Sequence, residues 1–332
     1  MIKKAYKVRL YPNNEQEVLL RKTFGCVRKV WNTLLATNQQ GFATCGSEWK
    51  QTYNTTLLKK EFEFLNEVSA AALQQKSRDL KETYSQWFKS LKGKRKLAIG
   101  HPKFKKKGNS ESYRLPNQKF KFDQDLEIIQ LEKVGKISCK FNDTIPCDAR
   151  KISVTLKLTH SGKYYASVLV EQEIERLPLT GKKIGIDLGL KDLMTLSNGI
   201  VVKRANYLKE NQSKIKKAQK HLSRKTKGSN RYNKQRMKLA KLQEKVVNQR
   251  SWYINNITKA LVKDYDLICL ETLSSKEMQS VKNINKTLTE VSLYEVARQL
   301  EYKCSWYGKT FVKIDKWFPS SQLCSCCGNQ NK

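Results

Sequence analysis

The chain has 332 residues, of which 65 are Lys or Arg and 30 are Asp or Glu, so its formal net charge at pH 7 is +35. Hydrophobic residues make up 39% and aromatic residues 9%, which is enough to bury cores and excludes a disordered basic tail. No apolar run approaches the ~20 residues that a membrane-spanning helix needs, and no secretory signal is visible. The nine cysteines do not indicate a disulfide framework, and they favour a reducing cytoplasm.

This positive charge points to a polyanionic partner. An excess of this size opposes compaction unless a polyanion neutralises it, and nucleic acid is the abundant polyanion of the cytoplasm. A ribosomal-type structural protein and a protein that binds acidic membranes are the alternatives, and the composition favours a nucleic-acid-binding protein.

The first half of the chain predicts a β domain that contains a helical insertion. Residues 1–10 alternate between polar and apolar side chains, which predicts a strand, and helical spacing follows from Glu15 and again over 69–91. Residues 89–107 hold nine Lys or Arg and no acidic residue, which indicates a basic loop. From 113 to 174 the period changes to two, which predicts a small antiparallel sheet or barrel.

The second half predicts an α/β domain. Three short strands are expected over 184–188, 193–196 and 201–202. Residues 203–250 contain 17 Lys or Arg and two acidic residues on two helical stripes, so they predict a basic helical hairpin. The apolar run that ends in Glu271 predicts a strand buried on both faces, and a further helix and strand follow.

Asp187 is the first candidate metal ligand. It lies inside an apolar strand, between Gly185 and Gly189, on the face opposite to Ile184 and Ile186. Asp is unfavourable in strand interiors, and neighbours without side chains leave room for a metal ion and a phosphate backbone. The alternative is a surface Asp that precedes a turn.

Glu271 is the second candidate ligand. Taken alone, a carboxylate at the end of a strand is more often turned to solvent. If strands 184–188 and 267–271 are neighbours in one sheet, however, Asp187 and Glu271 can face the same ion. Two carboxylates that bind Mg²⁺ beside a basic groove are typical of phosphodiester hydrolysis.

The C-terminal residues include a zinc-knuckle pattern. Cys324 and Cys327 form a C-x-x-C-G sequence that supplies two of the four thiolates of a structural zinc site. No second C-x-x-C is present, so this chain binds Zn²⁺ only if the ribbon is completed by Cys326 or by distant ligands. A cysteine-rich end without metal is the alternative.

The basic runs are interleaved with aromatic residues, which is typical of nucleic-acid-binding surfaces rather than of faces that are only solvated. No phosphate-binding loop of the G-x-x-x-x-G-K-[ST] type occurs, so nucleotide hydrolysis has no support. The side chains expected to contact nucleic acid are Lys103, Lys105, Lys106, Lys107, Arg224, Lys225, Arg231 and Arg236.

These motifs resemble the TnpB family of insertion-sequence proteins, which are relatives of type V CRISPR effectors. The segment Ile184-Gly-Ile-Asp-Leu-Gly-Leu-Lys-Asp-Leu is similar to the first RuvC motif, and Ile268-Cys-Leu-Glu-Thr-Leu to the second. Trp317-Phe-Pro-Ser-Ser-Gln-Leu-Cys-Ser-Cys-Cys-Gly is similar to the approach to the zinc ribbon. Lys7-Val-Arg-Leu-Tyr-Pro and Trp306-Tyr-Gly-Lys extend the resemblance over nearly the whole chain.

The resemblance implies a multidomain fold of the α+β and α/β classes. An OB-like β-barrel, the wedge domain, would comprise residues 1–12 and 110–178, with a helical recognition insertion at 13–109. An RNase H-like RuvC domain would follow at 179–316 and include the basic hairpin 203–265, and residues 317–332 would form the first half of a zinc ribbon.

The resemblance also implies a function. The family cuts double-stranded DNA with Mg²⁺ or Mn²⁺ under the direction of a guide RNA transcribed from the transposon end, after recognising a short motif beside the target. Asp187 and Glu271 match its first two catalytic carboxylates, and the third lies beyond Lys332. The expectation is a bacterial or archaeal protein of the cytoplasm and nucleoid that binds guided DNA and is impaired in cleavage.

Two other hypotheses remain open at this stage. One is a structural nucleic-acid-binding protein without sequence preference that uses only its basic surface. The other is an active nuclease in which a nearby acidic residue, Asp192, Glu277 or Asp315, replaces the third ligand.

Overall fold

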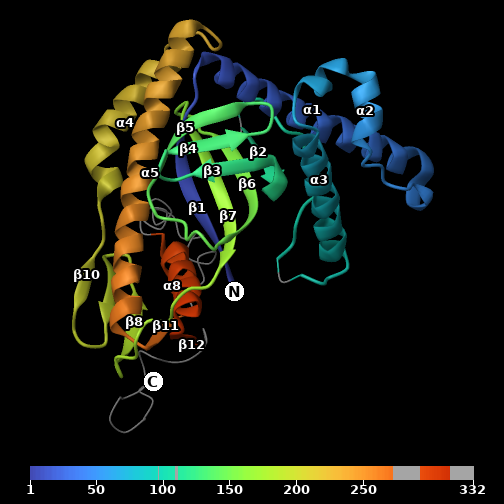
Figure 1. Ribbon diagram of the computed structural model, residues 1–332. Coiled ribbons are helices and arrows are strands. Elements are labelled where there is room, and N and C mark those ends of the chain that lie inside the picture. The colour runs from blue at the N-terminus through green and yellow to red at the C-terminus, as the bar shows by residue number, and fades with distance from the viewer. Residues whose placement is uncertain (96, 109–110, 272–291, 315–332) are drawn as a thin grey trace. The chain divides into compact units, whose positions relative to one another are not determined.

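The computed structural model describes residues 1–95, 97–108, 111–271 and 292–314 (Figure 1). The chain divides into two compact units, Met1–Glu173 and Ile174–Lys332. Within the described ranges, no helix combines the length and the apolar character that crossing a membrane requires.

A curled seven-stranded antiparallel sheet forms the base of the first unit (Figure 1), with the strand order β2-β6-β7-β1-β5-β4-β3. The first strand therefore lies at the centre of the sheet, between strands that come more than 120 residues later. This pairing confirms that the N-terminal strand joins the later β region. The strands are β1 (Ile2–Tyr11), β2 (Glu111–Pro116), β3 (Phe120–Asp123), β4 (Ile128–Leu131), β5 (Gly135–Phe141), β6 (Arg150–Leu158) and β7 (Tyr164–Gln172).

Three helices separate β1 from β2: α1 (Asn14–Cys45), α2 (Thr55–Glu61) and α3 (Ala70–Leu91). The first helix begins with a capping box, in which the Asn13 side chain accepts from the Gln16 backbone amide at 2.8 Å and the Gln16 side chain accepts from the Asn13 amide at 3.1 Å. This helix continues ten residues beyond Leu35, the last residue that fits the helical spacing in the sequence, and α2 was not expected. Short 3₁₀ turns lie at Gly46–Glu48, Glu63–Glu67 and Asn117–Lys119.

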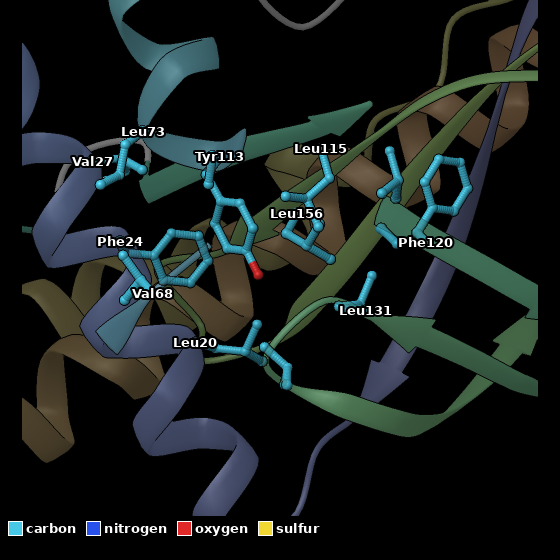
Figure 2. Close-up of a cluster of buried hydrophobic side chains, with 14 of the residues drawn as sticks. Leu20, Phe24, Val27, Val68, Leu73, Tyr113, Leu115, Phe120, Leu131 and Leu156 are labelled. Carbon is cyan, nitrogen blue, oxygen red and sulfur yellow. The ribbon is translucent and has the colours of Figure 1, made fainter. Parts of the chain in front are cut away.

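The core of the first unit joins these helices to the sheet, and Figure 2 shows its centre. The ring of Phe24 on α1 meets the edge of Tyr113 on β2 at a centroid distance of 5.3 Å. Leu20, Leu73 and Leu115 are completely buried around them. Each such side chain contributes about 1.5–3 kcal/mol when it leaves water, so the helices and the sheet of this unit form one core.

The sheet of the second unit has the order β10-β9-β8-β11-β12. Its strands are β8 (Lys183–Leu188), β9 (Asp192–Leu196), β10 (Val201–Lys203), β11 (Leu267–Glu271) and β12 (Thr310–Ile314). Strands β8, β9 and β10 pair antiparallel, whereas β11 lies parallel to both β8 and β12. Strands β9 and β10 form a hairpin. Strands 184–188 and 267–271 are neighbours in one sheet, which is the condition for Asp187 and Glu271 to face the same ion.

The helices of this unit are α4 (Tyr207–Ser223), α5 (Asn230–Asp264) and α8 (Leu293–Tyr307). Helices α4 and α5 run side by side and form the expected basic hairpin (Figure 1). The C-terminal part of α5 and helix α8 pack together, and Leu261, Val296 and Leu300 share a core with Ile186 and Ile268 of the sheet. One face of the sheet is thus covered by these two helices.

The expectation that β11 is buried on both faces is wrong. Ile268 and Leu270 are 0% and 1% exposed, whereas Leu267, Cys269 and Glu271 are only partly buried. The alternation was hidden in the sequence because the open face carries another leucine and a cysteine, which read as part of a continuous apolar run. The more open face is the one that carries Glu271.

The wedge, recognition-insertion and RuvC boundaries remain predictions, and the proposed half of a zinc ribbon at 317–332 lies outside the described residues.

Candidate active site

Strand β8 carries Asp187 on the open face of the sheet. Ile184, Ile186 and Leu188 are buried beneath the strand, so the alternating residues Gly185 and Asp187 face outward. Asp187 is exposed and pairs in register with Thr195 of β9. The period-2 pattern therefore placed this carboxylate on the correct face.

Strand β11 brings Glu271 next to Asp187. Ile186 and Leu270 are register partners in the parallel pair, and each carboxylate lies one residue farther along its own strand. Burial, together with the charge of Asp187 and a side-chain hydrogen bond with it, raises the pKa of Glu271 above its ordinary value. The two carboxyl groups are hydrogen-bonded neighbours, so the charge of Asp187 disfavours the charged form of Glu271 unless a cation or a proton lies between them.

The two carboxylates face an open hollow of about 520 Å³. Thr195 of β9 and Ser197, which directly follows β9, belong to the same lining, and sequence reasoning did not single them out. The alternation along β9 places Thr195 on the outward-facing side, so the sequence contained a signal for it. Its position opposite Asp187, however, depends on a strand register that the sequence does not specify. The complete lining is Gly185, Ile186, Asp187, Thr195, Leu196, Ser197, Glu271 and Ile314.

The two glycines beside Asp187 have different roles. Gly185 lines the hollow, and a Cβ built there would lie 3.5 Å from the Cβ of Ser197, an ordinary contact. A Cβ on Gly189 would lie 2.8 Å from the backbone oxygen of Asp192. Gly189 is therefore required by the tight connection between β8 and β9. Gly185 has no side chain to fill the hollow.

Two adjacent carboxylates on an open, hydroxyl-lined surface fit a hard divalent cation such as Mg²⁺ or Mn²⁺, which prefers oxygen ligands. A cation placed between Asp187 and Glu271 would offset the charge of Asp187, which contributes to the raised pKa of Glu271. In the part of the chain that the structure describes, no cluster of three or more His, Cys, Asp or Glu side chains is assembled. Asp192, a proposed substitute ligand, forms an ion pair with Lys203 at 3.0 Å instead.

The expected nucleic-acid contacts fall into two groups, one in each unit. Lys103, Lys106 and Lys107 are exposed on the segment after α3, whereas Lys105 of the same segment is half-buried. In the second unit, Arg224 and Lys225 lie in the connection between α4 and α5, and Arg231 and Arg236 lie in the first turns of α5. The side chains of Arg224, Arg231 and Arg236 are exposed. Cys324, Cys327, Glu277 and Asp315 lie outside the described residues.

Three family profiles match the chain. One described as "Probable transposase" matches residues 167–282, one described as "Helix-turn-helix domain" matches 1–46, and one described as "Cas12f1-like, TNB domain" matches 294–332. Residues 1–46 of this chain form the strand β1 and the single helix α1, so the second description does not correspond to the geometry seen here.

Relatives align along nearly the whole sequence. The "Putative RNA-guided DNA endonuclease" of Streptomyces pristinaespiralis is 29% identical over 98% of this chain and 81% of its own length. The "Putative RNA-guided DNA endonuclease InsQ" of Escherichia coli K12 is 29% identical over 99% of this chain and 84% of its own length. These matches confirm the resemblance to the TnpB family.

A solved structure shows that the similarity extends to the fold. The Cas12f1 chain in a cryo-EM structure of the Cas12f1–sgRNA–target DNA complex superimposes with a TM-score of 0.55. The alignment covers 100% of this chain and 92% of that chain, at 13% sequence identity. The chain therefore shares the mixed α and β fold of Cas12f1.

Proposed function

We propose that this protein is an RNA-guided DNA-binding protein whose nuclease centre is built on Asp187 and Glu271. The observation that carries the proposal is that parallel strands β8 and β11 bring these two carboxylates side by side in one hollow on the open face of the sheet. The names of the relatives and the net charge of +35 support RNA and double-stranded DNA as partners.

The architecture supports an assignment of the chain to three structural parts. We assign residues 1–12 and 110–178 to the wedge domain, because β1 pairs with both β5 and β7. The helices α1 to α3 interrupt this sheet in sequence and form the recognition insertion at 13–109. Residues 179–316 form the RuvC domain, within which the basic hairpin 203–265 connects β10 to β11.

Asp187 and Glu271 would hold the divalent ion, and Thr195 and Ser197 would line the approach of the scissile phosphate. A bound Mg²⁺ or Mn²⁺ would supply an activated water and stabilise the leaving oxygen. Gly185 has no side chain, which leaves space beside Asp187 for the nucleic-acid backbone. The exposed arginines of the α4–α5 hairpin would contact phosphates through charge-assisted hydrogen bonds.

The test begins with the protein purified from cells that carry its native locus. The bound RNA is sequenced, and the complex is incubated with Mg²⁺ or Mn²⁺ and a plasmid that matches the guide. We expect binding to the matched plasmid and not to a scrambled one. Absence of co-purified RNA together with equal affinity for both plasmids would refute the proposal and favour the structural nucleic-acid binder, which the charge alone supports.

Cleavage is scored in the same reaction with two variants. Asp187→Ala removes a proposed ligand, and Asp192→Ala is the matched control, because Asp192 lies in the same sheet but pairs with Lys203. The expectation from the sequence is guided binding with weak or no cutting. Cutting that Asp187→Ala abolishes and Asp192→Ala preserves would instead show an active nuclease with a complete set of ligands.

Metal binding has a readout that does not depend on cutting. Mn²⁺ should raise the unfolding midpoint of the wild-type protein in a concentration-dependent way, because it binds only the folded carboxylate pair. Asp187→Asn should remove most of this rise. An equal rise in both proteins would exclude the pair as the metal site.

A further inference from the structure

A small, positively charged pocket lies in the first unit. It is formed where the basic segment after α3 crosses α1 and the start of β2, and it has a volume of about 20 Å³. Its polar lining consists of Arg28, Lys76, Lys105, Lys106, Glu111 and Ser112.

The basic segment is fixed in place at this crossing. The Asn32 side chain accepts from the backbone amide of Lys105 at 2.8 Å and donates to its carbonyl at 3.0 Å. The indole nitrogen of Trp31 donates to the carbonyl of Lys103 at 3.0 Å, and the Lys105 ammonium lies 3.8 Å from the centre of the Trp31 ring. These contacts with Asn32 and Trp31 hold Lys105 in place, whereas the lysines beside it are exposed.

The carboxylates around the pocket are already engaged. Asp79 on α3 pairs with Lys76 at 3.3 Å and with Arg114 of β2 at 2.5 Å. Glu111 pairs with Arg28 of α1 at 3.1 Å. Among the described residues no carboxylate forms an ion pair with Lys105, so the pocket has an uncompensated positive charge.

Lys76 and Lys105 line the same small pocket, and Lys76 is only 6% exposed. Two ammonium groups carry only donors, so neither can accept a hydrogen bond from the other while both are charged. Burial and the charge of Lys76, opposed in part by Asp79, lower the pKa of Lys105 to about 8. An anionic oxygen between the two groups would accept from both and raise the pKa of Lys105 again.

We propose that this pocket binds one phosphate group of a nucleic-acid backbone, with Lys76 and Lys105 donating to a single non-bridging oxygen. A volume of about 20 Å³ admits one oxygen atom, while the rest of the phosphate stays at the mouth beside Lys106. The inference rests on the proposed function for its source of phosphate. It goes beyond a general basic surface because it names the site that anchors the strand.

Three variants test the site. Lys105→Gln removes the charge and keeps most of the side-chain volume, Lys105→Arg keeps a charge that does not titrate, and Lys107→Gln removes an exposed charge from the same segment. Binding of fluorescein-labelled single-stranded RNA and duplex DNA of mixed sequence is measured by anisotropy. We expect Lys105→Gln to lose about tenfold in affinity and Lys107→Gln about two- to threefold.

The pH dependence gives a second readout. The anion is bound only when Lys105 carries its proton, so wild-type affinity should fall as the pH rises above about 8, the pKa of Lys105 in the free protein. The groups that face Lys105 are Arg28 from α1, Lys76 and Asp79 from α3, and Glu111 and Arg114 from β2. Lys105→Arg should bind with a flatter pH profile over this range, which also controls for folding.

The occupant is identified by NMR of ¹³C-labelled lysine. The Cε signal of Lys105 should titrate near pH 8 in the free protein and at higher pH with RNA, and inorganic phosphate as a separate probe shows whether free phosphate is sufficient. A titration unchanged by RNA, or equal losses in the two glutamine variants, would mean that the pocket holds only water. Guide-dependent DNA binding that survives Lys105→Gln unchanged would refute this inference alone, whereas a Lys105 effect without guide dependence would refute the proposed function alone.

Discussion

Gly189→Ala and Gly185→Ala form a matched pair that tests how the structure positions Asp187. Both glycines lie two residues from Asp187, and neither has a positive φ, so an alanine is acceptable to the backbone at both positions. The difference is space: the nearest atom to a new Cβ is the backbone oxygen of Asp192 at 2.8 Å for Gly189, and the Ser197 Cβ at 3.5 Å for Gly185.

The magnitude follows from these contacts. The Asp192 oxygen belongs to the backbone, so relief requires a shift of about half an ångström in the β8–β9 connection. Overpacking of this kind costs about 1–3 kcal/mol. Reduced freedom of the unfolded chain returns about 0.4–1 kcal/mol to both variants. We therefore expect Gly189→Ala to be less stable than Gly185→Ala by about 2 kcal/mol, or about 4–8 °C in the transition of the second unit.

Differential scanning calorimetry of the two variants and the wild type measures this difference. Manganese-dependent stabilisation should also be weaker in Gly189→Ala, because the shift of the connection moves the end of β8. Equal midpoints for the two variants, or a Gly189→Ala protein more stable than Gly185→Ala, would refute the assignment of Gly189 to the tight connection.

Three further predictions concern charge and polar contacts. Burial and Asp187 raise the pKa of Glu271, so the metal-free folded chain holds this proton more tightly than the unfolded chain, and its stability should fall as pH rises from the ordinary glutamate value through the raised one. Asp187→Asn should reduce this pH-dependent loss of stability, measured by thermal unfolding with a chelator present. An unchanged pH profile would contradict the interaction between Asp187 and Glu271. Lys309 is completely buried and donates to Asp266 at 2.5 Å and to the Pro178 carbonyl at 2.7 Å, so Lys309→Ala should cost about 3 kcal/mol in urea unfolding. Lys313→Ala breaks an exposed pair with Glu301 and should change stability by less than about 0.5 kcal/mol, and equal effects would contradict the buried-pair argument. Asn38 is completely buried and donates to the carbonyls of Leu34 and Thr52 at 2.8 and 2.9 Å, so Asn38→Ala should cost about 2 kcal/mol and Thr37→Ala much less, and similar unfolding midpoints would be inconsistent with this network.

The sequence predicted most of the elements because their burial follows a simple period. β7 alternates along its whole length, and the stripes of α1 and α3 face one core. The last ten residues of α1 escaped prediction because they depend on a tertiary contact. Asn38 favours turns locally, yet its side chain bonds the Thr52 backbone in both directions and fixes the following loop against the helix.

The carboxylate pair was predictable as a hypothesis, because Asp187 interrupts one short apolar strand and Glu271 ends another. What the sequence could not supply was the strand order, since β8 and β11 are separated by β9, β10 and two helices. The same limit hid Thr195 and Ser197. The run of lysines at 103–107 also gave no sign that Lys105 differs from its neighbours, because its burial depends on Asn32 and Trp31 of a distant helix.

The central position of β1 has a consequence for synthesis of the protein. Its two partners, β5 and β7, leave the ribosome only after residues 141 and 172 have been added. At typical rates of translation, this delay is roughly ten to thirty seconds.

During that interval the nascent chain exposes a ten-residue strand with both edges unpaired, a state prone to aggregation. Positive charge lies along this strand at Lys3, Lys7 and Arg9. In the folded protein these residues lie on the outer face of the sheet. They would act as gatekeepers against pairing with other nascent chains until the correct partners arrive.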